Sequence, residues 1–274
     1  MGKLVLVTLP IGNLEDITIR ALTTLKEQQS FLTEDTRSFK QLLSRLEIPL
    51  EGKRVTSYHD QSNPDKTNQL LALIKAGETL YLVSEAGSPV ISDPAYPLIK
   101  AVVASGHQVT TIPGVTSPTT ALELSALPPL PHTFHGFLPR ERGKQKEQFL
   151  FWKELAGTHI FFEAPGRVLA SVELLAQTLP QSQIVITREL TKKFESIYRF
   201  NADDFQQIKE QIILKGEFTI LVYIKPENRQ MISPDLIAQA NDYILSEKQG
   251  KRQLAKILAQ IVGQPTKDIY KKLC

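Results

Sequence analysis

Cysteine is almost absent from this sequence, and so are the patterns that anchor a chain in a membrane. The one cysteine, Cys274, is the last residue, so an internal disulfide and a cysteine metal cluster are both excluded, and a reducing compartment is expected. No apolar run is long enough to span a bilayer, and no segment has the pattern of a signal peptide. These absences together predict a cytoplasmic protein.

The standard motifs of several enzyme classes are missing as well. There is no G-x-G-x-x-G after a strand, no G-x-x-x-x-G-K-S/T, no H-E-x-x-H and no C-x-x-C. This argues against a Rossmann dehydrogenase, a P-loop NTPase and a zinc hydrolase. The five histidines lack the accompanying ligands that a metal site needs, so we predict no metal. They are His59, His107, His132, His135 and His159.

Charge is small in total but unevenly distributed. The formal net charge is +3, yet seven basic residues face only Asp268 between Lys248 and Lys272. A second basic stretch, Arg140 to Lys146, follows a Phe-Leu-Pro sequence. Two separate basic patches suit a polyanionic partner such as RNA, although ordinary solvated helix faces are the alternative.

The first half alternates short apolar runs with amphipathic stretches, which predicts a mostly parallel, doubly wound α/β sheet. The expected strands are 3–8, 30–33, 54–58, 79–83 and 108–112, and the expected helices are 18–28, 38–46, 65–76, 96–105 and 118–127. The run Leu-Pro-Pro-Leu-Pro at 127–131 cannot continue a helix. We therefore place a domain boundary there, with a first domain at 1–127.

The second half predicts another α/β domain, at 132–225. Strands are expected at 133–137, 158–163, 183–188, 194–200 and 217–224, and helices at 145–156, 167–179 and 202–214. The third and fourth of these strands are close enough to form a hairpin, so this sheet should be mixed.

A small helical module is expected at 233–274. Ser233 and Pro234 suit a helix start, and Gly263 and Pro265 separate two final helices in a helix-turn-helix-like spacing. The first of these helices carries an apolar stripe at helical spacing. It consists of Leu254, Ile257, Leu258, Ile261 and Val262.

Turn-forming and polar residues follow every strand of the first half. The loops are 10–13, 34–37, 59–60, 84–94 and 113–118. The carboxyl ends of parallel strands lie at one edge of a sheet, where doubly wound proteins bind ligands. Five such loops therefore predict a binding cleft, although any single glycine or proline could only shape its turn.

Nine segments resemble, in order, the ribosomal RNA small subunit methyltransferase I family of the tetrapyrrole methylase superfamily. They are TLPIGNLEDIT, EDTR, SYHDQSN, EAGSPVISDP, IPGVTSPTTALELSALP, FHGFLPR, FFEAPGR, RELTKKFE and KGEFTILV. The resemblance implies two α/β domains, S-adenosylmethionine in the cleft between them, a homodimer, and 2′-O-methylation of a cytidine in small-subunit ribosomal RNA, naked or in the assembled subunit. The chain departs from the family pattern at Glu85, Ser88, Ala95 and Gly166.

The same resemblance assigns the residues that hold the cofactor. They are Pro10, Gly12, Gly87, Ser88, Pro89, Ile91, Gly114, Ser117, Pro118, Ala164 and Phe218.

Methyl transfer to a ribose hydroxyl needs a positioned base and a nearby cation. We expect Glu34 or Asp35 as the base and Arg37 and Lys192 as the cations, while a structural Asp35–Arg37 ion pair is the alternative. His59 or Asp60 would orient the nucleotide, and Arg188 and Glu189 would supply further charges from the second domain.

RNA is expected to lie across two groups of basic residues. They are Arg140, Arg142, Lys144 and Arg167 near the cleft, and Lys251, Arg252, Lys267 and Lys271 at the C-terminal end. A small-molecule tetrapyrrole methylase and a non-catalytic RNA-binding protein are the competing interpretations. The first would not need a basic tail, and the second would not need the intact glycine and proline loops.

Overall fold

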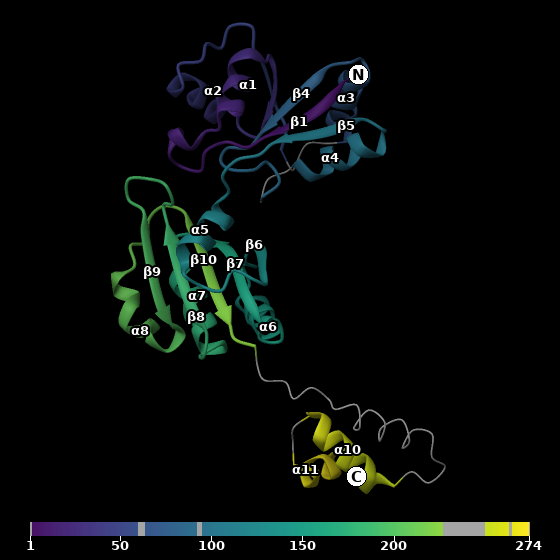
Figure 1. Cartoon of the computed structure of the whole chain (residues 1–274), viewed down its shortest axis with the longest axis vertical. Helices are drawn as coiled ribbons and strands as arrows, with labels where there is room; N and C mark the ends of the chain where they lie inside the picture. Colours follow the sequence, from purple (N-terminus) through teal and green to yellow (C-terminus); the bar gives the residue numbers. More distant parts are fainter. Residues whose placement is uncertain (1, 60–63, 92–94, 227–249, 263–264, 274) are drawn as a thin grey trace. The chain divides into compact units, whose positions relative to one another are not determined.

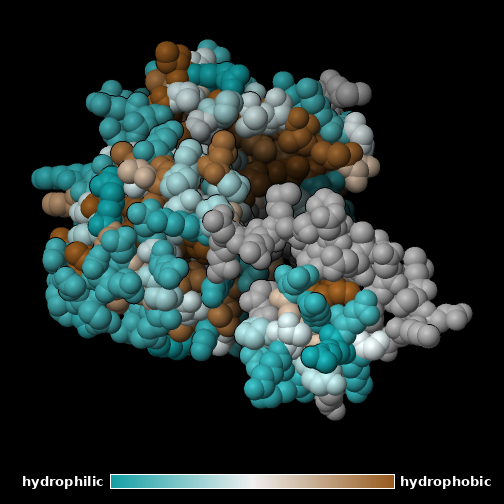
Figure 2. Space-filling view, turned by 60° about the horizontal axis from the view of Figure 1, so that its bottom comes forward, coloured by the Kyte–Doolittle hydropathy of each residue, from teal (hydrophilic) through white to brown (hydrophobic). Residues whose placement is uncertain are grey.

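A computed structural model describes residues 2–59, 64–91, 95–226, 250–262 and 265–273. The chain forms two compact units, Met1–Lys225 and Pro226–Cys274. Asp60 and the expected helix start at Ser233 and Pro234 lie outside the described residues. The elements are labelled in Figure 1, and Figure 2 shows a mostly hydrophilic surface interrupted by groups of apolar residues.

The first sheet is entirely parallel, as the alternating pattern predicted. Its strands run in the order β3-β2-β4-β1-β5. They are β1 (Lys3–Val7), β2 (Ser30–Thr33), β3 (Arg54–Ser57), β4 (Thr79–Val83) and β5 (Gln108–Ile112). Because all five strands point the same way, the loops that follow them emerge at one edge of the sheet.

Helices cover both faces of this sheet (Figure 1). Successive side chains of a strand point to opposite faces, so Leu4 and Leu6 pack with α3 and α4, while Val5 and Val7 pack with α1 and α2. The helices are α1 (Ile19–Glu27), α2 (Thr36–Arg45), α3 (Pro64–Lys75) and α4 (Ala95–Ala104), and a short 3₁₀ turn, η1 (Leu14–Asp16), precedes α1. This is the doubly wound arrangement.

The second sheet is mixed and runs in the order β6-β7-β10-β8-β9. Its strands are β6 (His132–Phe137), β7 (Gly157–Glu163), β8 (Gln183–Arg188), β9 (Ser196–Asn201) and β10 (Phe218–Ile224). Only β6 and β7 pair in parallel, and the expected hairpin is the antiparallel pair β8–β9. The prediction of a second, mixed sheet is confirmed.

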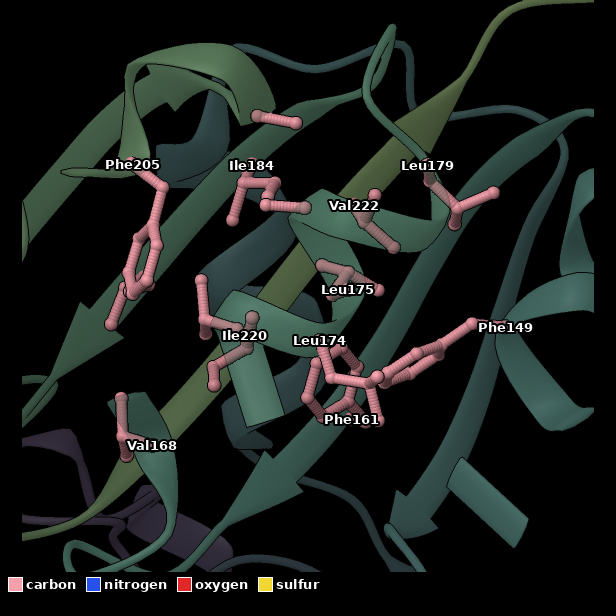
Figure 3. Packing of buried hydrophobic residues seen from close by; sticks show 14 of the residues in the cluster. Phe149, Phe161, Val168, Leu174, Leu175, Leu179, Ile184, Phe205, Ile220 and Val222 are labelled. Atoms are coloured by element: carbon pink, nitrogen blue, oxygen red, sulfur yellow. The ribbon is translucent and has the colours of Figure 1, made fainter. Parts of the chain in front are cut away.

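Apolar clusters form on both faces of the second sheet. On one face, α6 (Arg142–Lys153) and α7 (Val168–Thr178) pack against β7, β8 and β10, where the rings of Phe149 and Phe161 lie 6.4 Å apart (Figure 3). On the other face, α5 (Ser117–Ser125) contacts β8, β9 and β10, and Ala121 packs with Ile160 and Leu221. The helix that follows the last strand of the first sheet thus covers the second sheet.

The prediction of a single helix over 202–214 is wrong. The segment consists of η2 (Ala202–Asp204), α8 (Phe205–Ile208) and η3 (Lys209–Gln211), two 3₁₀ turns around one α-helical turn. Ala202 and Phe205 are buried and Ile208 packs against the same cluster. The spacing of three residues from 202 to 208 fits a 3₁₀ repeat, and the same cluster also includes Ile212, which follows after four.

The C-terminal unit contains two described helices, α10 (Lys251–Val262) and α11 (Thr266–Leu273), which pack on each other. Their contact is built on Ala255, Ala259 and Ile269, with Leu258 of the predicted stripe and Leu273 packed against them, whereas Ile261 of the stripe is 37% exposed. Small alanines let the two short helices approach closely. Within the described part of the chain, no helix combines the length and apolarity needed to cross a membrane.

Candidate active site

A pocket of about 470 Å³ lies within the first unit, and loops of both sheets line it. Its residues are Ile11, Glu85, Ala86, Gly87, Ser88, Ile91, Thr116, Ser117, Phe137, Phe162, Glu163, Ala164, Pro165, Leu190, Gly216, Glu217, Phe218 and Thr219. The volume is in the range of small-molecule sites, roughly 300–1,000 Å³. The pocket combines apolar rings with carboxylates and loop backbone, which suits a ligand that is both apolar and charged.

The loop after β4 is held in shape by its own backbone. Gly87 has a φ of 70° and exchanges two backbone hydrogen bonds with Leu9, of 2.9 and 3.0 Å. The Ser84 hydroxyl donates to the Gly87 carbonyl at 2.7 Å. Glycine adopts a positive φ without strain, so Gly87 brings this backbone to the pocket where another residue would resist.

The 189–195 loop after β8 carries a bridging lysine beside the pocket. Lys192 Nζ lies 3.0 Å from a Glu189 carboxylate oxygen and 2.9 Å from one of Glu217, which lines the pocket. Burial lowers the pKa of Lys192, but hydrogen bonds and charges from Glu217 and Glu189 outweigh it and raise the pKa above its ordinary value. For Glu189, burial raises the pKa, but the hydrogen bond from the Glu217 amide and the hydrogen bond and charge of Lys192 outweigh it, so the pKa lies below its ordinary value. Both groups therefore stay charged.

The same loop interlocks with the loop after β1. The Asn13 amide donates to the Thr191 hydroxyl at 3.0 Å. A Cβ placed on Gly12 would lie 2.5 Å from Lys192 Cγ, 2.7 Å from Thr191 Oγ1 and 2.8 Å from the Leu190 carbonyl oxygen. Glycine at position 12 is thus required by the close approach of the 189–195 loop.

A buried carboxylate fixes the other wall. Glu163 has a fully buried side chain that accepts hydrogen bonds from the Ala164 amide at 2.9 Å and the Ser171 hydroxyl at 2.6 Å. Arg167 donates to the same carboxylate, with Nε at 3.0 Å, and to the carbonyls of Leu138 and Pro139. This network ties the end of β6 to β7 and α7, next to the pocket wall that Ala164 forms.

Six of the expected cofactor residues line the pocket: Gly87, Ser88, Ile91, Ser117, Ala164 and Phe218. Five do not: Pro10, Gly12, Pro89, Gly114 and Pro118. Pro10, Pro89 and Pro118 are buried, and a Cβ on Gly114 would meet the Thr8 side chain at 3.0 Å.

Sequence reasoning missed several lining residues. They include Ile11, Glu85, Thr116, Phe137, Phe162, Glu163, Leu190 and Glu217. The family-like segments FHGFLPR, FFEAPGR and KGEFTILV contain several of them, so the signal was present. Glu85 is exposed, and within the described part of the chain it forms no ion pair.

The expected catalytic turn after β2 lies outside the pocket lining. Asp35 caps α2, and its carboxylate accepts a hydrogen bond from the Arg37 backbone amide at 2.7 Å. The contact between these two residues is therefore to the Arg37 backbone, whereas the alternative considered for the pair was an ion pair with the Arg37 side chain. Glu34 lines a small cavity together with Ser84 and Pro89, so it lies beside the loop that follows β4. His59 is exposed.

Two arginines have different surroundings from those expected. Arg188 is 6% exposed and donates to the carbonyls of Lys215 at 2.5 Å and Phe194 at 2.7 Å. The guanidinium of Arg167 is occupied by Glu163 and two carbonyls, as described above. These contacts argue for structural roles, against a catalytic charge at Arg188 and an RNA contact at Arg167.

The remaining basic residues are exposed. Lys144 pairs with Glu141 at 2.7 Å, whereas Arg140 and Arg142 form no ion pair within the described residues. Lys251, Arg252, Lys267 and Lys271 are exposed on α10 and α11.

Two histidines stack in the core beside α6. His135 Nε2 lies 3.0 Å from His159 Nδ1, and both rings stack on Trp152. Burial, with a smaller contribution from the charge of His159, lowers the pKa of His135 to about 4. Burial also lowers the pKa of His159, against a hydrogen bond to the Leu155 carbonyl. Among the residues described, no three His, Cys, Asp or Glu side chains gather as metal ligands.

Comparison with known proteins gives a consistent result. The sequence profile described as Tetrapyrrole (Corrin/Porphyrin) Methylases matches residues 3–206. The chain is 34% identical over 274 residues to a protein of Halalkalibacterium halodurans named Ribosomal RNA small subunit methyltransferase I, covering 98% of this chain and 93% of that one. A protein of the same name from Rickettsia prowazekii is 34% identical over 271 residues, with the same coverage.

Solved structures share the fold at low identity. Diphthine synthase aligns with a TM-score of 0.63 at 12% identity, covering 82% of this chain and 90% of that one. The methyltransferase CobJ aligns with a TM-score of 0.60 at 16% identity, covering 84% and 97%. A uroporphyrin-III C-methyl transferase from Thermus thermophilus, complexed with S-adenyl homocysteine, aligns at a TM-score of 0.50 and 15% identity, covering 81% and 97%.

Proposed function

Because the chain belongs to the tetrapyrrole methylase family and, within it, to the ribosomal RNA small subunit methyltransferase I proteins, we propose that it methylates a cytidine of small-subunit ribosomal RNA at the ribose 2′-oxygen. Its methyl donor is S-adenosylmethionine. The observation that carries the proposal is the pocket, which the loops after the parallel strands share with the ends of β7 and β10. We expect the protein to act in the cytoplasm as a homodimer.

The pocket residues fit this donor. When bound there, S-adenosylmethionine would supply a methyl group on a cationic sulfur, with S-adenosylhomocysteine as the leaving group. The carboxylate of Glu85 suits the positive charge of such a ligand, and the Gly87 backbone leaves room for close approach. Phe218, 3% exposed, supplies an apolar wall.

The ribose hydroxyl must lose its proton as its oxygen bonds to the methyl carbon, and the chain offers a base and a cation for this. We assign the base to Glu34 rather than Asp35, because Asp35 already caps α2 while Glu34 lies beside Ser84 and Pro89. Lys192 is the cation, since it stays charged between Glu189 and the pocket residue Glu217. The proton would go to the Glu34 carboxylate, and Lys192 would stabilise the negative charge that develops on the oxygen before its bond to the methyl carbon is complete.

Transfer of a tritiated methyl group into purified small ribosomal subunits, followed by nucleoside analysis, tests the proposal. We expect label in 2′-O-methylcytidine. Lys192→Met and Glu34→Gln should each reduce turnover at least tenfold while S-adenosylhomocysteine binding persists. The matched controls are the neighbour Lys193→Met and the exposed Glu51→Gln, which should behave as wild type. Label on a base, or no label at all, would refute the proposed activity.

The basic residues of α10 and α11 are proposed to bind RNA phosphates. A variant with Lys251, Arg252, Lys267 and Lys271 changed to Ala should bind small-subunit RNA more weakly and with a shallower salt dependence, by about one unit of slope per lost contact. The control removes four exposed lysines of the first unit: Lys26, Lys40, Lys75 and Lys100. Equal slopes for both variants would exclude phosphate binding by these helices.

A further inference from the structure

An exposed aromatic ring stands at the mouth of the pocket. Phe137 lines the pocket and is nevertheless 59% exposed, whereas the lining residue Phe218 is 3% exposed. A phenylalanine left open to water in this way loses the stabilisation that burial gives. Its position makes sense if a second apolar surface covers it when the substrate binds.

A backbone irregularity directs this ring toward the pocket. β6 pairs with β7 so that Phe134 lies opposite Ile160 and Phe137 lies opposite Phe162, which leaves one extra residue in β6. Residues three apart in a regular strand point to opposite faces, but here Phe134 and Phe137 both contact Phe162, with ring centroids 4.9 and 5.4 Å apart. Bulges re-aim side chains in this way beside active sites.

Glycine makes the bulge possible. Gly136 has a φ of 67°, a left-handed conformation that residues with a Cβ adopt only with strain. The Phe137 and Phe162 rings then pack in an edge-to-face contact with an interplanar angle of 63°, and Phe137 still keeps 59% of its surface exposed.

Two exposed arginines follow this ring in the chain. Arg140 is three residues beyond Phe137, a distance of at most about 11 Å between Cα atoms. Arg140 and Arg142 are exposed and form no ion pair within the described residues. S-adenosylmethionine carries no phosphate, so exposed cations three and five residues beyond the ring in the chain suit a nucleic acid better than the adenine of the cofactor.

We propose that Phe137 is the platform on which a base of the RNA substrate stacks at the pocket mouth, while Arg140 and Arg142 bind the adjoining phosphates. Single-stranded RNA is bound through stacking of unpaired bases on aromatic side chains, combined with basic residues that contact the backbone. The inference rests on the proposed function, because it assigns the substrate of the same site.

Three substitutions at Phe137 test the platform. Phe137→Leu keeps the apolar bulk but removes the aromatic surface, and we expect kcat/KM for small subunits to fall about tenfold, the size of one lost base stack. Phe137→Ala should fall at least as far, and Phe137→Trp should retain activity. S-adenosylhomocysteine affinity, measured by calorimetry, should stay unchanged in all three. The matched control is Phe151→Leu, at a ring on α6 that is 63% exposed and outside the pocket lining.

Several results would overturn the platform. Wild-type kcat/KM in Phe137→Leu, or an equal loss in Phe151→Leu, would show that the ring contacts no base. A parallel loss of S-adenosylhomocysteine affinity would place the ring on the cofactor, and a change of oligomeric state in light scattering would make it a subunit contact. Failure of the proposed function looks different, because wild-type protein would then transfer no methyl group to the subunit.

The phosphate contacts are tested separately by RNA binding. With S-adenosylhomocysteine present, Arg140→Ala and Arg142→Ala should each weaken RNA binding and reduce the salt slope by about one unit. Lys144→Ala, at a lysine already paired with Glu141, should have a smaller effect. Unchanged salt slopes for both arginine variants would show that Arg140 and Arg142 do not bind RNA phosphates.

Discussion

Gly12→Ala should separate the two loops that meet beside the pocket. The added methyl carbon would lie 2.5 Å from Lys192 Cγ and 2.8 Å from the backbone oxygen of Leu190. A lysine side chain can move at little cost, but a carbonyl within a loop cannot. The 189–195 loop must therefore shift away from position 12, and the hydrogen bond from the Asn13 amide to Thr191 is strained or lost.

The expected loss of stability follows from these contacts. Forcing a methyl group into a packed contact costs about 1–3 kcal/mol, and losing one hydrogen bond costs about 0.5–1.5 kcal/mol. Together they predict a decrease of about 1.5–4.5 kcal/mol in the free energy of unfolding. For a unit of this size each kcal/mol lowers the melting temperature by about 2–4 °C, so the expected shift is roughly 3–18 °C.

Thermal and urea unfolding of Gly12→Ala measure this directly, with Gly166→Ala as the control, since a Cβ at position 166 meets no atom within 4 Å. The control should unfold as wild type does, within about 0.5 kcal/mol. Turnover should also fall, because the shift moves Lys192. If Gly12→Ala were as stable and active as Gly166→Ala, the interlock between the loops would not constrain position 12, and the reasoning from close approach would fail.

Two further predictions concern buried polar groups. Glu163→Gln replaces the carboxylate that accepts hydrogen bonds from Arg167, Ser171 and Ala164, so we expect urea unfolding to show a loss of about 2–4 kcal/mol in the free energy of unfolding. The control is Glu147→Gln at an exposed position, and equal stabilities of the two variants would mean that the network contributes nothing. The second concerns His135, whose pKa is lowered to about 4 in the folded chain. Below pH 6.5 the unfolded chain binds a proton at this histidine and the folded chain does not. The contribution of neutral His135 to stability is therefore complete above pH 6.5 and is lost as the pH falls toward 4. The melting temperature should decline over that interval and decline less steeply in His135→Gln, and parallel profiles would contradict this.

Much of the fold could be predicted because its signals are local. The run Leu4–Val7 is buried on both faces, and the helical stretches that follow each strand have one apolar face, so the doubly wound sheet is visible in the order of residues alone. The edge of the sheet that carries the binding loops follows from the same pattern.

The roles of individual charges could not be predicted in this way. The sequence shows that Arg167 and Arg188 are basic, but their direction depends on the carbonyls of Leu138 and Lys215, each nearly thirty residues away in the chain. The requirement at Gly12 comes from Thr191, 178 residues from its neighbour Asn13. Such contacts depend on tertiary packing, so the local sequence pattern does not predict them.

Helix α5 belongs to one half of the chain by connection and to the other by contact. It follows β5 directly, yet Ala121 packs with Ile160 and Leu221, and Arg199 of β9 donates to the carbonyls of Leu124 and Ser125 at its end. A fragment that began after the proline-rich run would leave this helix behind and would expose an apolar sheet face to water, a surface prone to self-association. The two sheets are therefore expected to be inseparable as soluble fragments, even though each is a complete sheet.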